Sequence, residues 1–312
     1  MSKLKGLLLT EGLHGMISQV EGLAKALDLE YFHEKIELNS FWNLIPPKIS
    51  PVSKVVFKNI INNDFDIIIS CGRKSIIPSI YLKKNSKKKI INIHIQNPKV
   101  SLSNFDFIIS PDHDNLEGNN VIISKGAIHY LTLEEINASR NYLENKIDRN
   151  KSVITLILGG PTKYYSYNES NITNIFSKIK KQINQHNLQL IVIPSNRTPK
   201  NTINFAKEYF DNSSLVLENV DKNAYLSSLA LSNYIVVTCD SSSMISEAAL
   251  TGKPIYVAML PASKNDHRFK KFRDLFKKLK IIKELNNELE IWSYENLDET
   301  NRIANEIKKK IF

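Results

Sequence analysis

Short apolar runs alternate with amphipathic stretches along the whole chain of 312 residues. The clearest example is residues 234–257, which read Y-I-V-V-T-C-D-S-S-S-M-I-S-E-A-A-L-T-G-K-P-I-Y-V. The β-branched run at 235–238 is typical of a buried strand in a parallel sheet. From Ser243 onward the apolar residues recur at helical spacing until Gly252 and Pro254, which favour the end of a helix. The stretch therefore predicts a strand, a hydroxyl-rich turn, a helix and a second strand.

The same alternation recurs in both halves of the chain. Further strands are expected at 4–10, 31–38, 67–71, 90–95, 107–110, 121–124, 153–158, 188–193 and 215–217, with helical patterns between most of them. Strands that alternate with helices predict parallel sheets with helices on both faces, and polar loops gathered at one edge. The fold class is thus α/β.

A charged stretch without apolar residues, 148–151, interrupts the series, and a chain of this length exceeds a single core. We expect two Rossmann-type doubly wound domains that face each other across a cleft. The predicted boundaries are 1–148 for an N-terminal domain and 149–312 for a C-terminal domain. The last helix is expected to pack back on the N-terminal domain.

The formal charge of +10 suggests a nucleic-acid partner at first sight. Most of it is lysine, spread through a chain rich in Lys, Asn and Ile, and only 264–280 concentrates it, with eight Lys or Arg against two Asp. We therefore expect no nucleic-acid partner. Cys71 and Cys239 form no C-x-x-C pair, and the apolar runs are too short to cross a bilayer, so a cytoplasmic protein with free thiols is expected.

The hydroxyl-rich turn predicts phosphate binding. A helix N-terminus at the carboxyl edge of a parallel sheet presents N–H groups to anions. Glu247, in the first turns of that helix, is placed to accept both hydroxyls of a ribose. The alternative is that Glu247 only complements the helix dipole and that the serines are caps. The candidate ligand contacts in this stretch are Asp240, Ser241, Ser242, Ser243, Met244 and Glu247.

Two other turns of the second half carry candidate ligand contacts. Gly159 and Gly160 follow one expected strand and would let backbone N–H groups approach a diphosphate. Ser195, Arg197 and Thr198 follow the next strand, and a planar guanidinium can bridge a diphosphate with two donors. The alternative is a surface arginine beside an ordinary turn.

Asp112, His113 and Asp114 follow a strand of the first half and allow three interpretations. They form a structural turn, or a general base with orienting carboxylates, or half of a metal site. The metal is the weakest of these because no second His or Cys stands at ligand spacing, and no metal is expected.

Several segments, in chain order, resemble the Elm-type (elongated mitochondria) mitochondrial fission protein family, whose bacterial members are often labelled predicted nucleoside-diphosphate-sugar epimerases. They are G-x-x-G-x-x-x-Q-x-x-G-L-A from Gly12, C-G-R-K from Cys71, P-D-H-D from Pro111, L-G-G-P from Leu158, S-N-R-T-P from Ser195 and V-T-C-D-S-S-S-M-I-S-E-A from Val237. The resemblance adds Gly12, Gly15, Gln19 and Arg73 as residues of the expected cleft. Met16 stands where the family often has a histidine, so the resemblance carries no catalytic histidine to that turn.

More remotely, the architecture is similar to GT-B glycosyltransferases and nucleotide-sugar 2-epimerases. That similarity implies a C-terminal half that binds a nucleoside diphosphate or its sugar, of uridine type, with a glutamate at the place of Glu247. It favours an enzyme, a glycosyltransferase or sugar epimerase acting on a nucleotide-sugar donor, with no tightly bound cofactor.

The alternative function is a non-catalytic adaptor with the same fold that recruits a partner at a membrane surface, as the fission factor implies. Residues 41–52 place six apolar residues among three prolines. We expect this segment to dock a lipid-linked acceptor or a membrane, which would make the protein peripheral to the inner face of a membrane. The alternative is that Trp42 and its neighbours cap the sheet. The pattern predicts no oligomeric state.

Overall fold

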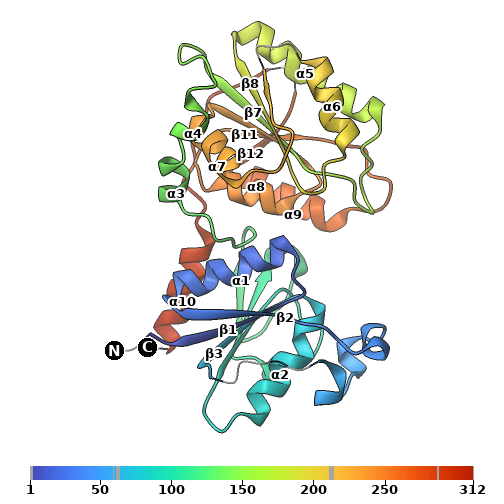
Figure 1. Cartoon of the computed structure of the whole chain (residues 1–312), viewed down its shortest axis with the longest axis vertical. Helices are drawn as coiled ribbons and strands as arrows, with labels where there is room; N and C mark the ends of the chain where they lie inside the picture. The colour runs from blue at the N-terminus through green and yellow to red at the C-terminus, as the bar shows by residue number, and fades with distance from the viewer. Residues whose placement is uncertain (1–2, 59, 61–63, 211–213, 287, 312) are drawn as a thin grey trace. The chain divides into compact units, whose positions relative to one another are not determined.

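The chain folds into two compact α/β units in the computed structural model, which describes residues 3–58, 60, 64–210, 214–286 and 288–311. Unit 1 consists of Met1–Tyr130 together with Asp298–Phe312, and unit 2 of Leu131–Leu297 (Figure 1). Each unit has its own six-stranded sheet.

The sheet of unit 1 has the strand order β2-β1-β3-β4-β5-β6, and all its pairings are parallel. The strands are β1 (Lys5–Thr10), β2 (Glu30–Lys35), β3 (Ile67–Cys71), β4 (Ile91–Ile95), β5 (Phe107–Pro111) and β6 (Val121–Ser124). The α-helices of this unit are α1 (His14–Ala26), α2 (Ile76–Asn85) and α10 (Glu299–Ile311).

The sheet of unit 2 has the order β12-β11-β10-β7-β8-β9, again entirely parallel. Its strands are β7 (Val153–Leu158), β8 (Gln189–Pro194), β9 (Leu215–Val216), β10 (Tyr234–Thr238), β11 (Ile255–Ala258) and β12 (Ile282–Glu284). Its helices are α3 (Leu133–Ala138), α4 (Asn141–Glu144), α5 (Glu169–His186), α6 (Lys200–Tyr209), α7 (Lys222–Leu231), α8 (Ser242–Ala249) and α9 (His267–Lys278).

Both sheets are doubly wound, because the strand order reverses beside β1 in one and beside β7 in the other. The predicted pair of parallel α/β sheets is confirmed. The central strands β3, β7 and β10 are buried throughout, as their unbroken apolar runs predict. None of the helices in the described ranges is long and apolar enough to cross a membrane.

The division between the units differs from the boundary expected at 148. Residues 131–148 lie in unit 2 because α3 and α4 pack on α7, where Leu143 N donates to Ser227 Oγ at 3.0 Å. The charged stretch that suggested the boundary is a turn within this unit, and the N–H of Asp148 donates to the Gln189 side chain at 2.6 Å.

The final helix, α10, belongs to unit 1. Its residues Ile303, Ala304 and Ile307 are buried in the same apolar cluster as Leu8 and Val20. The start of the helix is held by polar contacts as well, since Lys125 N donates to the Glu299 carboxylate at 2.8 Å. The chain therefore returns to its first unit after completing the second.

Candidate functional site

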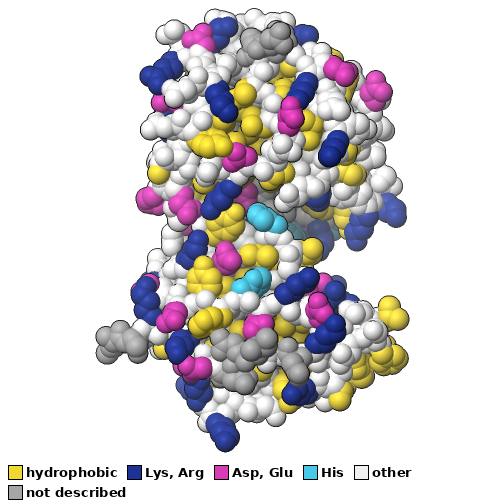
Figure 2. Space-filling view, viewed as in Figure 1, with side chains coloured by type: hydrophobic (Ala, Val, Ile, Leu, Met, Phe, Trp, Pro, Cys, Tyr) yellow, Lys and Arg dark blue, Asp and Glu magenta, His cyan; other side chains and the backbone are white. Residues whose placement is uncertain are grey.

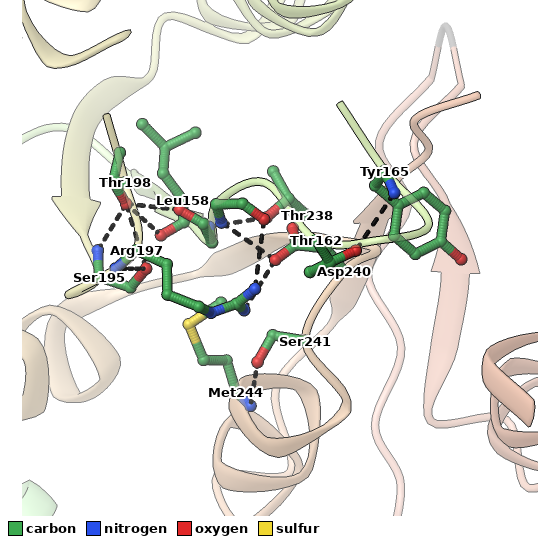
Figure 3. Close-up of polar contacts among 12 residues, drawn as sticks. Leu158, Thr162, Tyr165, Ser195, Arg197, Thr198, Thr238, Asp240, Ser241 and Met244 are labelled. Carbon is green, nitrogen blue, oxygen red and sulfur yellow. Dashed lines mark hydrogen bonds and ion pairs between the residues drawn. The ribbon is translucent and has the colours of Figure 1, made fainter. Parts of the chain in front are cut away.

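Three adjacent strands of unit 2, β10, β7 and β8, end at one edge of the sheet, and a polar turn follows each (Figure 3). The strand order reverses between β10 and β7, and ligands of open α/β sheets bind outside the carboxyl ends of strands at such a switch point. The residues that the sequence analysis placed after these strands do come together here.

The centre of this edge is the buried carboxylate of Asp240. Its Oδ2 atom accepts hydrogen bonds from Gly160 N at 3.0 Å and from Arg197 Nη2 at 2.8 Å. Its Oδ1 atom accepts from the hydroxyl of Tyr167 at 2.6 Å. The side chain has no exposed surface, so these donors replace the water that an ionised carboxylate requires.

Gly159 and Gly160 make room for this carboxylate and for the turn beside it. A Cβ atom at Gly159 would lie 2.1 Å from Asp240 Oδ2, and one at Gly160 would lie 2.0 Å from the carbonyl oxygen of Arg197. Both N–H groups donate within the protein, Gly159 N to Thr238 Oγ1 at 2.8 Å and Gly160 N to Asp240. This corrects the expectation that these N–H groups face a diphosphate, because both already donate to buried side chains of unit 2.

Arg197 joins the turn after β8 to the turn after β7. Its Nη1 atom donates to the carbonyl of Gly160 at 3.2 Å, while Nη2 pairs with Asp240. The side chain nevertheless remains 41% exposed. Arg197 is therefore a fixed cation at the sheet edge that solvent reaches, held in place by a carboxylate that solvent does not reach.

The turn that carries Arg197 is closed by two hydroxyls. Ser195 N donates to Thr198 Oγ1 at 2.8 Å, and the Ser195 and Thr198 hydroxyls lie 3.2 Å apart. The hydroxyl of Thr198 also lies 2.9 Å from the carbonyl oxygen of Leu158, which it can reach as a donor. The Thr198 side chain therefore ties the turn after β8 to the end of β7, and the Ser195 hydroxyl, which accepts from Arg197 N at 3.3 Å, closes the turn from within.

Helix α8 begins directly after Asp240. Ser241 is its N-cap, since the backbone there is extended and its hydroxyl accepts from Met244 N at 3.3 Å. Ser242, Ser243 and Met244 are half-buried in the first turn. The first N–H groups of an α-helix have no acceptor within the helix, so this end offers donors and a partial positive charge beside Arg197.

Glu247 lies on the second turn of α8 and is half-buried. Its Oε2 atom accepts from the hydroxyl of Tyr225 at 2.8 Å. Loss of hydration raises the pKa of Glu247 to about 7, and the Tyr225 hydrogen bond acts in the opposite direction. The carboxyl group is thus poised to exchange a proton near neutral pH, and it is not simply a dipole partner in solvent.

The tyrosines that follow the Gly-Gly turn were not among the predicted site residues. Besides Tyr167, which contacts Asp240, the buried Tyr165 hydroxyl bonds to Asp266 and accepts from Arg273 Nη1 at 2.9 Å. Arg273 Nη2 pairs with Asp266 at 2.9 Å, so this cluster ties the loop after β7 to α9. The signal was the K-Y-Y-S-Y run at 163–167, which places three hydroxyl-bearing aromatic side chains a few residues after the glycine turn.

In unit 1, the structure places Asp112, His113 and Asp114 on a 3₁₀ turn after β5. His113 Nε2 lies 3.8 Å from Asp114 Oδ1, and both side chains are largely buried. Within the described residues, no group of three or more His, Cys, Asp or Glu side chains is arranged to hold a metal ion. The imidazole and the Asp114 carboxylate are therefore neighbours, at a separation longer than a hydrogen bond.

The remaining predicted cleft residues lie at the carboxyl edge of the unit 1 sheet. Gly12 turns the chain after β1 with φ of +84°, and Gln19 donates to the Gly15 carbonyl at 3.0 Å within α1. Arg73 follows β3, and its guanidinium donates to the carbonyls of Ile45, at 3.1 Å, and Asn43. Arg73 therefore holds a loop of its own unit.

Two doubly wound parallel sheets give the chain a GT-B-like or epimerase-like fold. A UDP-GlcNAc 2-epimerase from Neisseria meningitidis, solved bound to UDP-GlcNAc, has a similar fold. The TM-score is 0.54 at 12% identity, over 99% of each chain. A glycosyltransferase from Rickettsia africae has a TM-score of 0.50 at 11% identity, over all of this chain and 95% of that one.

The chain belongs to the mitochondrial fission ELM1 family, whose model matches residues 14–311. The chain is 24% identical over 281 residues to the mitochondrial fission protein ELM1 of Arabidopsis thaliana, across 78% of this chain and 64% of that protein. The family resemblance drawn from the sequence is confirmed.

Proposed function

We propose that unit 2 binds the nucleoside diphosphate of a nucleotide sugar, of uridine type, at the carboxyl edge of its sheet. The observation that carries the proposal is the meeting of Arg197, Asp240 and the start of α8 at the switch point between β10 and β7. The similar fold of a 2-epimerase solved with UDP-GlcNAc supports the same ligand class.

Each group at this edge has a role in the proposal. The first N–H groups of α8 and the exposed part of Arg197 take the diphosphate, since both carry positive charge toward solvent. Asp240 positions Arg197 and does not itself contact the anion. Glu247 accepts the ribose hydroxyls, and Tyr225 orients its carboxylate.

The reaction class that suits this arrangement is glycosyl transfer or sugar epimerisation. In both, negative charge develops on the departing diphosphate, and fixed donors stabilise it.

A second candidate function is the adaptor, which keeps the fold without the reaction. The observation that favours it is that the Arg197 guanidinium already bonds to Asp240 and to the Gly160 carbonyl. An adaptor of this kind retains the internal network and has no measurable affinity for the nucleotide.

Titration calorimetry with UDP, UMP, ADP and UDP-GlcNAc separates these candidates. We expect UDP to bind and Arg197→Gln to weaken its affinity about 10- to 100-fold, the value of one charge-assisted hydrogen-bonding contact. Arg302→Gln is the matched control, because Arg302 is 40% exposed and also pairs with a buried carboxylate, that of Glu299, but in unit 1. Equal UDP affinity in both variants, or no binding to the parent, contradicts the nucleotide site.

A further inference from the structure

Large apolar side chains are exposed in one segment of unit 1 far more densely than elsewhere. Five of the eleven exposed large hydrophobic side chains in the described part of the chain lie within residues 41–55, hereafter the apolar loop. They are Phe41, Leu44, Ile49, Val52 and Val55. The loop is the blue lobe beside the sheet of unit 1 in Figure 1, and hydrophobic side chains gather on it in Figure 2. A local concentration of this kind marks an interaction surface.

Contacts with the rest of unit 1 hold the backbone of the apolar loop in place. The exposed side chains therefore have fixed positions on the surface. An antiparallel bridge between Leu38 and Phe57 closes its base. Arg73 donates to the carbonyls of Asn43 and Ile45 from outside the loop. Trp42 packs on a second apolar cluster of unit 1, which includes Leu7 and Leu9, and this contact anchors the loop on its inner side. Hydration of these exposed apolar side chains is unfavourable in the free protein. A partner that covers them removes this unfavourable contribution.

The charged side chains within the apolar loop are all positive. Lys48 and Lys54 are exposed in it, Lys58 follows it, and the sequence has no Asp or Glu from 38 to 63. Lys58 pairs with Glu37, whereas the next acidic residue after the loop is Asp64. A partner that complements this surface therefore offers both apolar groups and negative charges.

A hollow of about 440 Å³ lies beside the apolar loop. Val52, Ile77 and Ile80 contribute apolar lining, and Lys48 and Lys99 are the cationic residues that line it. An amphiphile with a phosphate head fits this combination, since lysine binds phosphate as a point charge and the lining accepts hydrocarbon.

We infer that the apolar loop docks unit 1 on the surface of a bilayer that contains anionic lipid. Phe41, Leu44 and Ile49 enter the interface, where aromatic and aliphatic side chains meet the acyl boundary, and the lysines contact lipid phosphates. A bilayer accepts scattered apolar side chains without a matching shape, and its negative surface matches a loop that lacks carboxylates. The inference does not depend on the nucleotide site of unit 2.

Sedimentation of the full chain with vesicles of phosphatidylcholine and phosphatidylglycerol at low salt tests it. We expect the parent to sediment with vesicles that contain 30% phosphatidylglycerol, because each lysine near an anionic surface raises the partition coefficient roughly fivefold. Leu44→Ser with Ile49→Ser should reduce the partition coefficient at least tenfold, since these side chains are 83% and 70% exposed and their loss leaves the core intact. Ile291→Ser with Val220→Ser is the matched control, with two exposed apolar side chains removed from unit 2 and no loss expected.

The charges are tested separately. Lys48→Glu with Lys99→Glu should abolish sedimentation, whereas Lys84→Glu with Lys181→Glu, at two other exposed lysines, should retain most of it. A parent that stays in the supernatant at low salt overturns the inference. So does equal sedimentation of the Leu44, Ile49 variant and its control. A parent that forms a dimer in sedimentation equilibrium, dissolved by the Leu44, Ile49 variant, instead assigns the apolar loop to a second copy of the chain.

Discussion

Arg197 Nη2 lies 2.8 Å from Oδ2 of Asp240, so a half-exposed cation is held by a carboxylate with no exposed surface. Asp240 also accepts from Gly160 N and from Tyr167, which makes it the point where three segments of unit 2 meet. Removal of this carboxylate therefore disturbs the backbone after β7 as well as the arginine.

Asp240→Ala should lower the free energy of unfolding of unit 2 by about 2 to 4 kcal/mol, because it strands an N–H group, a hydroxyl and a guanidinium. Asp240→Asn keeps one acceptor and should cost less. Urea unfolding followed by circular dichroism gives the values. Glu218→Ala, which breaks an exposed ion pair with Lys207 in the same unit, is the control and should change stability by less than about 1 kcal/mol. A loss for Asp240→Ala no larger than the control would show that Asp240 does not organise the edge.

The two glycines after β7 give a steric prediction. Gly159→Ala places a Cβ atom 2.1 Å from Asp240 Oδ2, which forces the carboxylate out of its position. We expect a loss of more than about 2 kcal/mol, the scale of overpacking combined with a broken buried network. Gly15→Ala, in α1 with no atom within 4 Å of the added carbon, should instead stabilise by about 0.5 to 1 kcal/mol. Both are measured by chemical unfolding, and a Gly159→Ala variant as stable as the parent contradicts the packing described for this turn.

Glu247 predicts a pH dependence of stability. Its pKa is raised in the folded state to about 7 from 4.5, so the folded protein keeps a proton that the unfolded chain releases between these values. The free energy of unfolding should therefore fall by up to about 3 kcal/mol as pH rises from about 4.5 to 7. Above pH 7 the contribution of Glu247 should no longer change. Glu247→Gln, which still accepts from Tyr225, should be more stable than the parent at pH 8 and equal to it at pH 4.5. A difference between the two proteins that does not change with pH would contradict this assignment.

Loss of the buried Tyr165 hydroxyl beside α9 should lower the free energy of unfolding more than loss of the exposed Tyr142 hydroxyl, which makes a similar hydrogen bond. Tyr165→Phe removes a hydroxyl that contacts both Asp266 and Arg273, and both partners are largely buried. We expect a loss of about 1 to 3 kcal/mol. Tyr142→Phe removes an exposed hydroxyl that bonds to Asp221 at 2.6 Å and should cost less than about 1 kcal/mol. Thermal unfolding of the two variants side by side checks this, and equal losses would argue against a structural role for the buried cluster.

Local patterning was sufficient for the strands, the helices and their parallel arrangement. The run at 235–238, the serines at 241–243 and the glycine after the helix determine a strand–turn–helix whatever the rest of the chain does, because period, capping and backbone freedom act over a few residues. The same applies to Thr132, the N-cap of α3, whose hydroxyl accepts from Glu135 N at 3.1 Å.

Three features of the structure could not be predicted from local sequence, because each depends on contacts between distant segments. They are the partner of Asp240, the place of residues 148–151 and the surroundings of the Gly-Gly turn. Asp240 has the residue type of a helix cap, yet Ser241 is the N-cap and Asp240 binds Arg197, 43 residues earlier in the chain. The charged stretch at 148–151 looks like a linker but lies inside unit 2, because the packing of α3 and α4 on α7 decides the division.

The role of Gly159 and Gly160 changed in the same way. The sequence establishes that the backbone there is permissive, while the tertiary structure decides what approaches it, a buried carboxylate and a neighbouring carbonyl. Local periodicity and capping operate within one element and can be read from its residues. The partners of a buried charge are chosen by which strands become neighbours, and that choice is made only when the sheet assembles.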